Sequence, residues 1–360
     1  MTTLNRRSLM KAAGAAATLS LVGTAARAED KIKIGFIFLG PIGDYGWTWA
    51  HNKGREAVDA ALGDKVETIY VENVAEDASA IPLIRDLANQ GCKLIFTCSY
   101  GYMEQTLTVA KEFPDVKFEH CTGFKRTDNV ATYNSKFHEG RAVLGTIAGK
   151  MSKSGTLGYL GSYKVPEVVL GVNAFALAAQ KQNPAATVKL VLIDSWFDPP
   201  KEAAATETLI NLGCDIVTTH TDSPGPLQIL EQKGLFGFGQ GADMSAFAPT
   251  AHLTAIEDIW GPYYVQRAQA IVDGTWTSTD TWDGMKEGTV VIAPYNAAIP
   301  ADVVALADGV QAGYKDGSYD IFTGPIFDQD GVEKVKAGEI MTLEQLASID
   351  WFVKGVESAA

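Results

Sequence analysis

Residues 31–62 read KIKIGFIFLGPIGDYGWTWAHNKGREAVDAAL, and this stretch decides the fold class. Its first nine residues form a short β-rich apolar run, a loop rich in glycine and aromatic residues follows, and the last eleven have a helical pattern. The same alternation recurs through the chain, with strand-like runs such as KLIFTCS and VKLVLIDS separated by helical stretches such as ASAIPLIRDLANQG. Alternating β and α elements predict an α/β fold with doubly wound parallel sheets covered by helices.

The first 28 residues, MTTLNRRSLMKAAGAAATLSLVGTAARA, have the layout of a signal peptide. A basic segment precedes a short apolar run and the small-residue site Ala26-Arg27-Ala28, which predicts cleavage after Ala28. The pair Arg6-Arg7 indicates a twin-arginine signal, although ordinary Sec signals also contain such pairs. No other stretch approaches the roughly 20 apolar residues of a membrane helix. We therefore expect a soluble periplasmic protein without a membrane anchor.

The charge of the chain argues against two classes of partner. The 360 residues carry a formal net charge of −13, and removing the leader takes away four basic residues and no acid, which leaves 332 residues with −17. That length is sufficient for two domains with cores of their own. Nucleic acid and anionic lipid attract basic surfaces, so the acidic balance excludes both as expected partners.

The reactive residue types show no metal, cofactor or catalytic signature. The four cysteines form no CxxC pair, and Cys98 and Cys214 lie in or beside apolar runs, which is typical of small buried residues. The five histidines show no HExxH or other paired spacing. GxSxG, P-loop and GxGxxG motifs are absent from the sequence. We therefore expect neither a cofactor nor an enzyme.

Aromatic residues gather in the loops that follow the predicted strands. Three of these tryptophans have an acid nearby: Trp47 with Asp44, Trp196 with Asp198, and Trp260 with Asp258. Ligands of α/β proteins bind beyond the carboxyl ends of the strands, and aromatic faces stack on flat molecules. The pattern predicts a slot for a flat heteroaromatic ligand. The other tryptophans are interpreted as hydrophobic contacts of the fold: Trp49, Trp276, Trp282 and Trp351.

Several longer motifs resemble one known family. FLGPIGDYGWTWAHNKG, VAKEFPDVKFEHCTG and the tail IFTGPIFDQDGVEKVKAGE are similar to the basic membrane protein (BMP) family of ABC-transporter substrate-binding proteins. The tail motif, Thr323-Gly324-Pro325 with Asp328 and Gly331, is specific to that pattern. The resemblance implies a type I periplasmic-binding-protein fold of two α/β lobes with a ligand cleft between them, and a purine or purine nucleoside as ligand.

The resemblance also implies where the lobes begin and end. The N-terminal lobe is expected to comprise residues 31–135 and 255–295. The C-terminal lobe is expected to comprise residues 136–254 and 296–360. The signal peptide is expected to comprise residues 1–28.

The family's binding pattern is only partly kept. Its loop pattern Asp-x-Ser-Phe-Asn corresponds to residues 44–48, where Trp47 replaces the stacking phenylalanine and Thr48 replaces the asparagine. Thr122 stands where the family has an aspartate. One of two paired aspartates, Asp243, is kept, while the other falls on glycine, and a lysine is lost near Asp258. These changes shorten the groups that would hold a ribose.

The resemblance and the loop pattern together give a set of expected ligand-binding residues. They are Asp44, Tyr45, Trp47, Thr48, Tyr100, Thr122, Glu139, Trp196, Phe197, Asp243, Asp258 and Trp260. Trp47 would form one wall, braced by Tyr45 or Trp49. The carboxylates of Asp44, Asp243 and Asp258 would accept ligand N–H groups, because ionised acceptors make the stronger hydrogen bonds.

We therefore expect a monomeric binding protein that delivers a purine, as a free nucleobase such as adenine, to an ABC permease by closing its lobes around it. A purine nucleoside is the alternative ligand, and Glu139 or Asp222 could then hold the ribose. A receptor that reports ligand occupancy to a membrane signalling protein would have the same fold and site. An enzyme such as a nucleoside hydrolase would need positioned acid and base groups.

Overall fold

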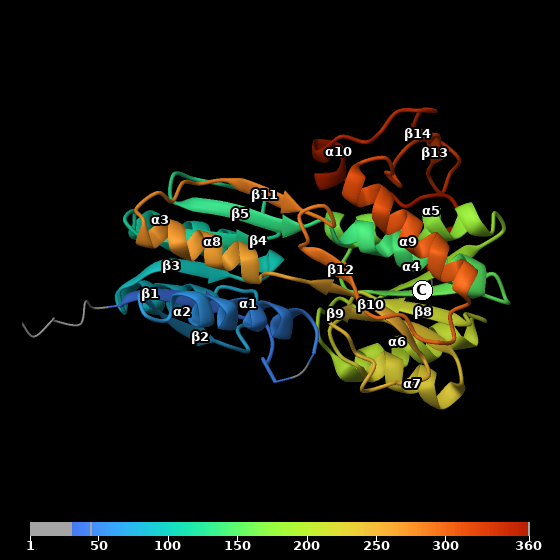
Figure 1. Cartoon of the computed structure of the whole chain (residues 1–360), viewed down its shortest axis with the longest axis horizontal. Helices are drawn as coiled ribbons and strands as arrows, with labels where there is room; N and C mark the ends of the chain where they lie inside the picture. The colour runs from blue at the N-terminus through green and yellow to red at the C-terminus, as the bar shows by residue number, and fades with distance from the viewer. Residues whose placement is uncertain (1–30, 44, 359–360) are drawn as a thin grey trace, which may run out of the picture. The chain divides into compact units, whose positions relative to one another are not determined.

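The computed structural model describes residues 31–43 and 45–358. The expected signal peptide and the expected ligand residue Asp44 lie outside the described residues. Within the part of the chain that is described, no helix has the length and apolar character required to cross a bilayer. The chain folds into two sheets with helices on both faces of each, and we call each sheet with its helices a lobe (Figure 1).

The sheet of the first lobe has six parallel strands in the order β11-β5-β4-β3-β1-β2. The strands are β1 (Ile32–Ile37), β2 (Val66–Val71), β3 (Cys92–Thr97), β4 (Lys117–Cys121), β5 (Val130–Ser135) and β11 (Asp280–Asp283). The helices are α1 (Trp47–Leu62), α2 (Ala80–Asn89), the 3-10 turn η1 (Tyr100–Tyr102), α3 (Met103–Glu112) and α8 (Gly261–Val272).

Alternation along β1 divides the core of the first lobe between the two faces of its sheet. Ile34 and Phe36 pack in the cluster under α1 and α8, whereas Ile37 packs in the cluster under α2 and α3. Phe36 stacks on Phe96 of β3 with ring centroids 4.8 Å apart. The near-continuous apolar runs of the sequence therefore reflect strands that are buried on both faces.

The sheet of the second lobe has seven strands in the order β12-β10-β9-β8-β6-β7-β15, and only the pair β10–β12 is antiparallel. The strands are β6 (Thr156–Gly161), β7 (Thr187–Leu192), β8 (Ile216–Thr219), β9 (Phe236–Gly241), β10 (His252–Asp258), β12 (Val290–Ile292) and β15 (Val356–Ser358). The helices are α4 (Phe137–Met151), α5 (Pro166–Gln182), α6 (Pro199–Asn211), α7 (Gly225–Lys233), α9 (Ala301–Asp316) and α10 (Leu343–Ala347). A separate hairpin pairs β13 (Ile326–Phe327) with β14 (Glu333–Val335).

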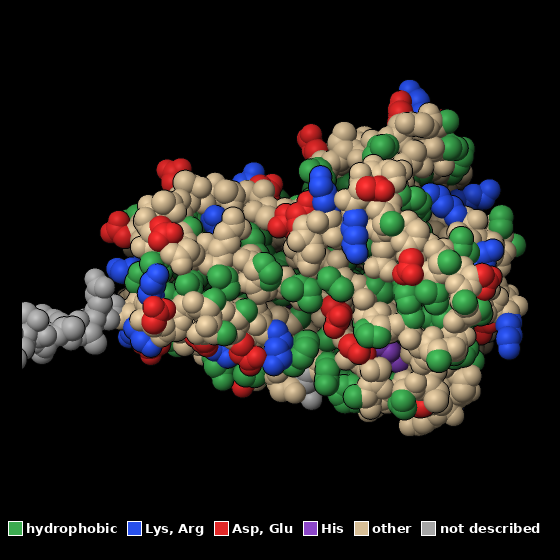
Figure 2. Space-filling model, in the orientation of Figure 1, with side chains coloured by type: hydrophobic (Ala, Val, Ile, Leu, Met, Phe, Trp, Pro, Cys, Tyr) green, Lys and Arg blue, Asp and Glu red, His purple; other side chains and the backbone are tan. Residues whose placement is uncertain are grey.

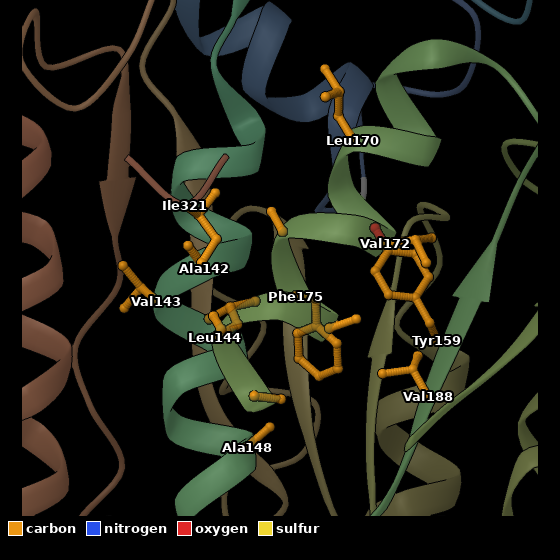
Figure 3. Close-up of a cluster of buried hydrophobic side chains, with 14 of the residues drawn as sticks. Ala142, Val143, Leu144, Ala148, Tyr159, Leu170, Val172, Phe175, Val188 and Ile321 are labelled. Carbon is orange, nitrogen blue, oxygen red and sulfur yellow. The ribbon is translucent and has the colours of Figure 1, made fainter. Parts of the chain in front are cut away.

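Helices α4 and α5 form the centre of the second core (Figure 3). All side chains of α4 from residue 137 to 149 are buried, so this helix is not amphipathic. A Cβ on Gly145 would lie 2.3 Å from the carbonyl oxygen of Phe175, and one on Gly149 would lie 2.4 Å from that of Ala179. The two glycines therefore allow the two helix backbones to touch.

Three connections join the lobes, and they lie side by side. The chain passes from β5 to α4, from β10 to α8, and from β11 to β12. The N–H of Lys136 donates to the carbonyl of Asp283 at 2.7 Å, and the N–H of Ile259 donates to the carbonyl of Thr289 at 2.8 Å. Crossing segments of this kind are where a hinge motion between lobes would occur.

The stretch 255–295, expected wholly in the N-terminal lobe, divides between the two sheets. Helix α8 packs on α1, and β11 pairs with β5 in the first sheet. The strands β10 and β12 pair with each other in the second sheet. Only the middle of the stretch therefore lies with the first lobe.

The surface in view mixes both signs of charge. Figure 2 shows acidic and basic side chains interspersed over that face, among scattered apolar ones. The described residues form no continuous basic patch on that face.

Candidate functional site

A cavity of about 330 Å³ lies where loops after the strands of both sheets meet. The first lobe contributes Leu39, Trp47, Ser99, Tyr100 and Thr122, which come directly after β1, β3 and β4 or begin α1. The second lobe contributes Glu167, Trp196, His220, Asp222 and Gln240, which follow β6, β7 and β8 or end β9. The lining therefore joins the carboxyl ends of two sheets, as expected for α/β proteins.

Trp47 forms a fixed wall of this cavity. It is the first residue of α1, and its indole Nε1 donates to the carbonyl of Cys98 at 2.7 Å. The rings of His51 and Trp260 meet the indole edge-on, with centroids at 4.5 and 5.9 Å. These contacts hold the indole plane, which leaves the half-buried ring available for stacking.

The rings behind Trp47 form a second, buried layer. The imidazole of His51 stacks on Trp260 at 4.8 Å with an interplanar angle of 8°, and its Nδ1 lies 2.5 Å from the hydroxyl of Tyr264. Burial lowers the pKa of His51 well below its usual value, so the ring is neutral at pH 7. This layer supports Trp47 without placing a charge behind it.

Trp196 comes from the opposite lobe, in the loop after β7. Asp194, two residues before it, has a φ of 51°, in the left-handed region, and so turns the chain. The indole meets the rings of Tyr163 at 5.4 Å and His220 at 6.2 Å. The half-buried Trp196 is thus a second aromatic wall.

Asp198, the acid near Trp196, is used by the fold. Its carboxylate accepts the N–H of Lys201 at 3.1 Å and caps α6, which begins with Pro199 and Pro200. Aspartate before proline is a common helix start. The segment WFDPPKE therefore combines a cavity residue with a helix cap.

His220 is a buried, neutral member of the lining. Its Nδ1 lies 3.0 Å from the hydroxyl of Tyr159, and its Nε2 lies 3.7 Å from the carboxylate of Glu167. Burial lowers the pKa of His220, although Glu167 opposes the shift. The contact with Glu167 is therefore not an ion pair at neutral pH.

Thr122 has a strained backbone at the cavity. Its φ is 60°, its N–H donates to the carbonyl of Tyr133 at 2.8 Å, and its hydroxyl donates to the carbonyl of Cys121 at 2.7 Å. Left-handed backbone in a β-branched residue costs of the order of 1–3 kcal/mol and persists where the surroundings impose it. Strain of this kind clusters at functional sites.

The two lobes touch beside the cavity through glycine. A Cβ on Gly46 would lie 2.8 Å from the carbonyl oxygen of Asp222, and one on Gly241 would lie 3.2 Å from the backbone nitrogen of Trp47. Both glycines have positive φ, 107° and 71°. Burial, then the charge of Glu202, raises the pKa of Asp222 well above its usual value. Substitution at either glycine would push the lobes apart.

The structure brings some of the expected ligand residues together and separates others. Trp47, Tyr100, Thr122 and Trp196 line the cavity. Tyr45, Thr48 and Phe197 line a neighbouring hollow of about 280 Å³. Tyr45 stacks on Trp49 at 5.2 Å, and the rings in contact with Trp47 are His51 and Trp260, so the expected bracing of Trp47 by Tyr45 or Trp49 is wrong.

Trp260 and Asp258 lie beneath the surface of the cleft and not in the cavity lining. They are 2% and 4% exposed. A Cβ on Gly54 would lie 2.9 Å from Cβ of Trp260, because α1 and α8 approach closely there. Burial raises the pKa of Asp258 to about 8, although the nearby Ser135 opposes the shift, and neither carboxylate oxygen accepts a hydrogen bond of normal geometry within 31–43 and 45–358. The helix contact therefore draws this loop into the core.

The remaining expected residues lie elsewhere. Glu139 accepts the N–H of Met285 at 2.7 Å, at the crossing between β11 and β12, and burial raises its pKa to about 7. Asp243 lies 3.8 Å from Nε2 of His252 and accepts the N–H of Ser245 at 2.8 Å. Neither lines the cavity. Their part in ligand binding stays a prediction.

Five cavity residues were not expected from the sequence, namely Leu39, Ser99, Glu167, His220 and Gln240, and a sixth, Asp222, was expected only as an alternative contact of a ribose. Five of them lie within a few residues after a strand or at its end, and Glu167 begins α5. Their position at the carboxyl end of a strand is the signal that identifies them, because ligands of α/β proteins bind there.

The described residues offer no other reactive centre. No group of three or more His, Cys, Asp or Glu side chains among them could hold a metal ion. All four cysteines are free and buried, and burial had been predicted for Cys98 and Cys214. Burial raises the pKa of the Cys98 thiol to about 12, which makes it unreactive.

Comparison with known proteins agrees with this geometry. The family of PnrA-like ABC transporter substrate-binding proteins (Bmp) matches residues 31–308. A purine-binding protein of Brucella abortus is 52% identical over 94% of this chain and 96% of its own. A protein of Haloferax volcanii, provisionally named an ABC transporter glucose-binding protein, is 29% identical over 91% of this chain and 81% of its own.

Solved structures show the same fold. An ABC transporter solute-binding protein from Aeropyrum pernix K1 is 16% identical, with a TM-score of 0.70 over 80% of this chain and 92% of that chain. The two-lobed α/β architecture is thus that of periplasmic binding proteins. The chain belongs to the Bmp family of PnrA-like ABC transporter substrate-binding proteins, which are binding proteins and not enzymes.

Proposed function

We propose that this protein captures a purine, as a free nucleobase such as adenine, for an ABC importer. The observation that carries the proposal is the pair of half-buried indoles, Trp47 and Trp196, which line one cavity from opposite lobes. A flat ring between them would gain stacking on both faces. The 52% identical Brucella relative is named for purine binding, which supports the same ligand class.

The cavity favours a base over its riboside. The space between its lining residues is small, since it amounts to about 330 Å³ even with the part that is open to solvent. The hydroxyl of Thr122 already donates to a backbone carbonyl, and that of Thr48 already accepts the N–H of Gly40 at 3.1 Å. The Thr122 hydroxyl therefore has no proton left to donate to a ribose oxygen, and a buried ribose hydroxyl that finds no partner costs about 1–3 kcal/mol.

The transport role follows from the family. A substrate-binding protein of an ABC transporter hands its ligand to a permease, and closure of the lobes would present the loaded form. We place the mature protein in the periplasm as a monomer, with residues 1–28 removed. Detection of the mature form without that segment in the periplasmic fraction of expressing cells would test this placement.

A thermal-shift screen of the mature chain tests the ligand class. Adenine, hypoxanthine and guanine are compared with their ribosides, uracil and glucose. We expect the largest shift from a purine base, since ligand at 100 times its dissociation constant stabilises by roughly 2.7 kcal/mol. A larger shift with glucose, uracil or a riboside than with every purine base would contradict the proposal. Glucose is included because of the Haloferax relative.

A further inference from the structure

Gln240 is a cavity residue whose orientation is fixed by a buried arginine. It lies at the carboxyl end of β9 and is 3% exposed. The guanidinium of Arg141, on α4, donates to Oε1 of Gln240. Because arginine has donors and no acceptors, it is the oxygen of the Gln240 amide that faces Arg141. The amide nitrogen Nε2 must therefore face the other way.

Arg141 is itself held rigidly. Its guanidinium donates to Oγ1 of Thr218 and to the carbonyl of Thr219, both at 2.6 Å. The rings of Phe137 and Tyr159 lie 4.9 and 5.2 Å from its central carbon. The side chain is fully buried, and among residues 31–43 and 45–358 no carboxylate forms an ion pair with it. A positive charge thus lies directly behind the Gln240 amide, and the more distant carboxyl groups of Asp258 and Glu167 offset it in part.

The amide nitrogen of Gln240 is left as a donor for the cavity. Nε2 makes no hydrogen bond to any described residue, while the side chain lines the cavity. A hydrogen bond from a cation to the amide oxygen polarises the amide and strengthens its N–H donors. A ligand that displaces water from this donor and offers no acceptor leaves it unsatisfied, whereas a ligand with an acceptor there keeps a hydrogen bond.

The acceptors of the lining are placed on other residues. Glu167 and Asp222 present carboxyl groups to the same cavity, and Trp47 and Trp196 present ring faces. The polar lining is therefore complementary to a flat ligand that has N–H donors at one part of its edge and a lone pair at another. Aminopurines have both along the edge of one ring system.

Resting on the proposed function, we propose that Gln240 selects the ligand by donating to an unprotonated ring nitrogen of the purine, and that Arg141 is the positioning residue that fixes this donor. The substrate class is thereby narrowed to heteroaromatic bases with an exposed ring-nitrogen lone pair. An analogue in which a C–H replaces that nitrogen leaves the Gln240 donor unsatisfied and is discriminated against.

Calorimetry with adenine and its 1-, 3- and 7-deaza analogues tests this proposal. We expect one analogue to bind the wild-type protein tenfold or more weakly than adenine, which corresponds to 1.4 kcal/mol. Gln240→Glu keeps an oxygen for Arg141 and removes the N–H donor. The affinity of this variant for adenine should be tenfold or more below that of the wild-type protein. Its affinity for the same deaza analogue should be close to that of the wild-type protein, because the two changes remove one interaction.

The matched control is Gln228→Glu, the same substitution at an exposed position of α7 in the same lobe. It should leave both the affinity and the discrimination unchanged. Arg141→Met adds a readout that a merely structural role would not move, namely the adenine-to-analogue ratio, which should shrink toward one.

Three results separate the possible failures. Equal binding of adenine and all three analogues by the wild-type protein would overturn the role of Gln240 while leaving purine binding intact. A folded Gln240→Glu variant that binds adenine with wild-type affinity would also overturn the role of Gln240. Absence of adenine binding by the wild-type protein would overturn this proposal and its adenine ligand together, and the thermal-shift screen would then show whether any purine binding survives.

Discussion

The two halves of the cavity differ in the side chains that form them. The half from the first lobe rests on interlocked rings, with Trp47 held by His51, Trp260 and a backbone carbonyl. Among the described residues, the carboxyl and imidazole groups of the lining come from the second lobe, namely from Glu167, Asp222 and His220. The first lobe thus offers a rigid aromatic surface with hydroxyl groups beside it, and the second offers carboxyl and imidazole groups.

This division suggests how the halves share the work of binding. A rigid indole can hold a flat ring before the lobes close, since its orientation does not depend on the other lobe. The polar groups act only when closure brings them to the ring. Gly46 and Gly241 allow that approach, because a side chain at either position would strike the facing backbone.

The largest effect is expected at Asp258, where the chain crosses from the second lobe to the first. Asp258 ends the strand that leads to α8, and its folded pKa of about 8 lies well above its ordinary 3.8, through burial first and the charge of Glu167 second, while Ser135 and Arg141 oppose the shift. Between pH 3.8 and about 8, the carboxyl group of Asp258 is therefore protonated in the folded state and ionised in the unfolded chain. The free energy of unfolding should fall as pH rises through this window, by at most about 6 kcal/mol.

Asp258→Asn should remove that dependence. Urea unfolding of both proteins from pH 4 to pH 8 would show the wild type losing stability relative to the variant as pH rises. Parallel curves across this range would mean that Asp258 is ionised in the folded protein.

The next effect concerns the rigid half. Trp47→Ala should weaken purine binding by roughly 1–3 kcal/mol, the range for stacking of a base on an aromatic side chain. Calorimetry of adenine binding measures the loss, and circular dichroism checks that the variant is folded. An unchanged affinity would show that Trp47 does not stack on the ligand.

Trp196→Ala should cost less, about 0.5–1.5 kcal/mol, as expected for one aromatic pair. Among the described residues its ring makes no backbone hydrogen bond of the kind that fixes Trp47; it meets Tyr163 edge-on and lies at a tilt to His220. The same titration gives the ranking. A greater loss at Trp196 than at Trp47 would reverse the assignment of the rigid half.

The smallest effect is expected at Trp49, which is the matched control for Trp47. It lies on the same helix, stacks on Tyr45 and does not line the cavity. Trp49→Ala should change the affinity for adenine by less than about 0.5 kcal/mol, within the usual range for substitutions away from a site. A loss equal to that of Trp47 would show that the aromatic loop acts as one unit.

The sequence was sufficient for the fold because the signals were local. Apolar runs alternating with helical patterns predicted parallel sheets, and the structure confirms two of them. The family resemblance supplied the two-lobed arrangement, which periodicity alone does not give. The crossing of the chain between lobes at residues 258–261 and 283–290 depends on tertiary pairing, so the expected range 255–295 could not be refined from sequence.

The site was harder to predict because it depends on packing across elements. Trp260 and Trp47 look alike in sequence, since both lie in a loop beside an acid, yet Gly54 lets α8 approach α1 and buries Trp260. Gln240 carries no signal of its own. Its role arises from Arg141, which lies 99 residues away in the chain.

Calorimetric titration of adenine, hypoxanthine and guanine beside their ribosides tests the central claim most directly. We predict that at least one free base binds about tenfold or more tightly than its riboside, because the cavity is small and the hydroxyl of Thr122 already donates its proton to a backbone carbonyl. Tighter binding of any riboside than of every free base would contradict the account and show that the cleft holds a nucleoside.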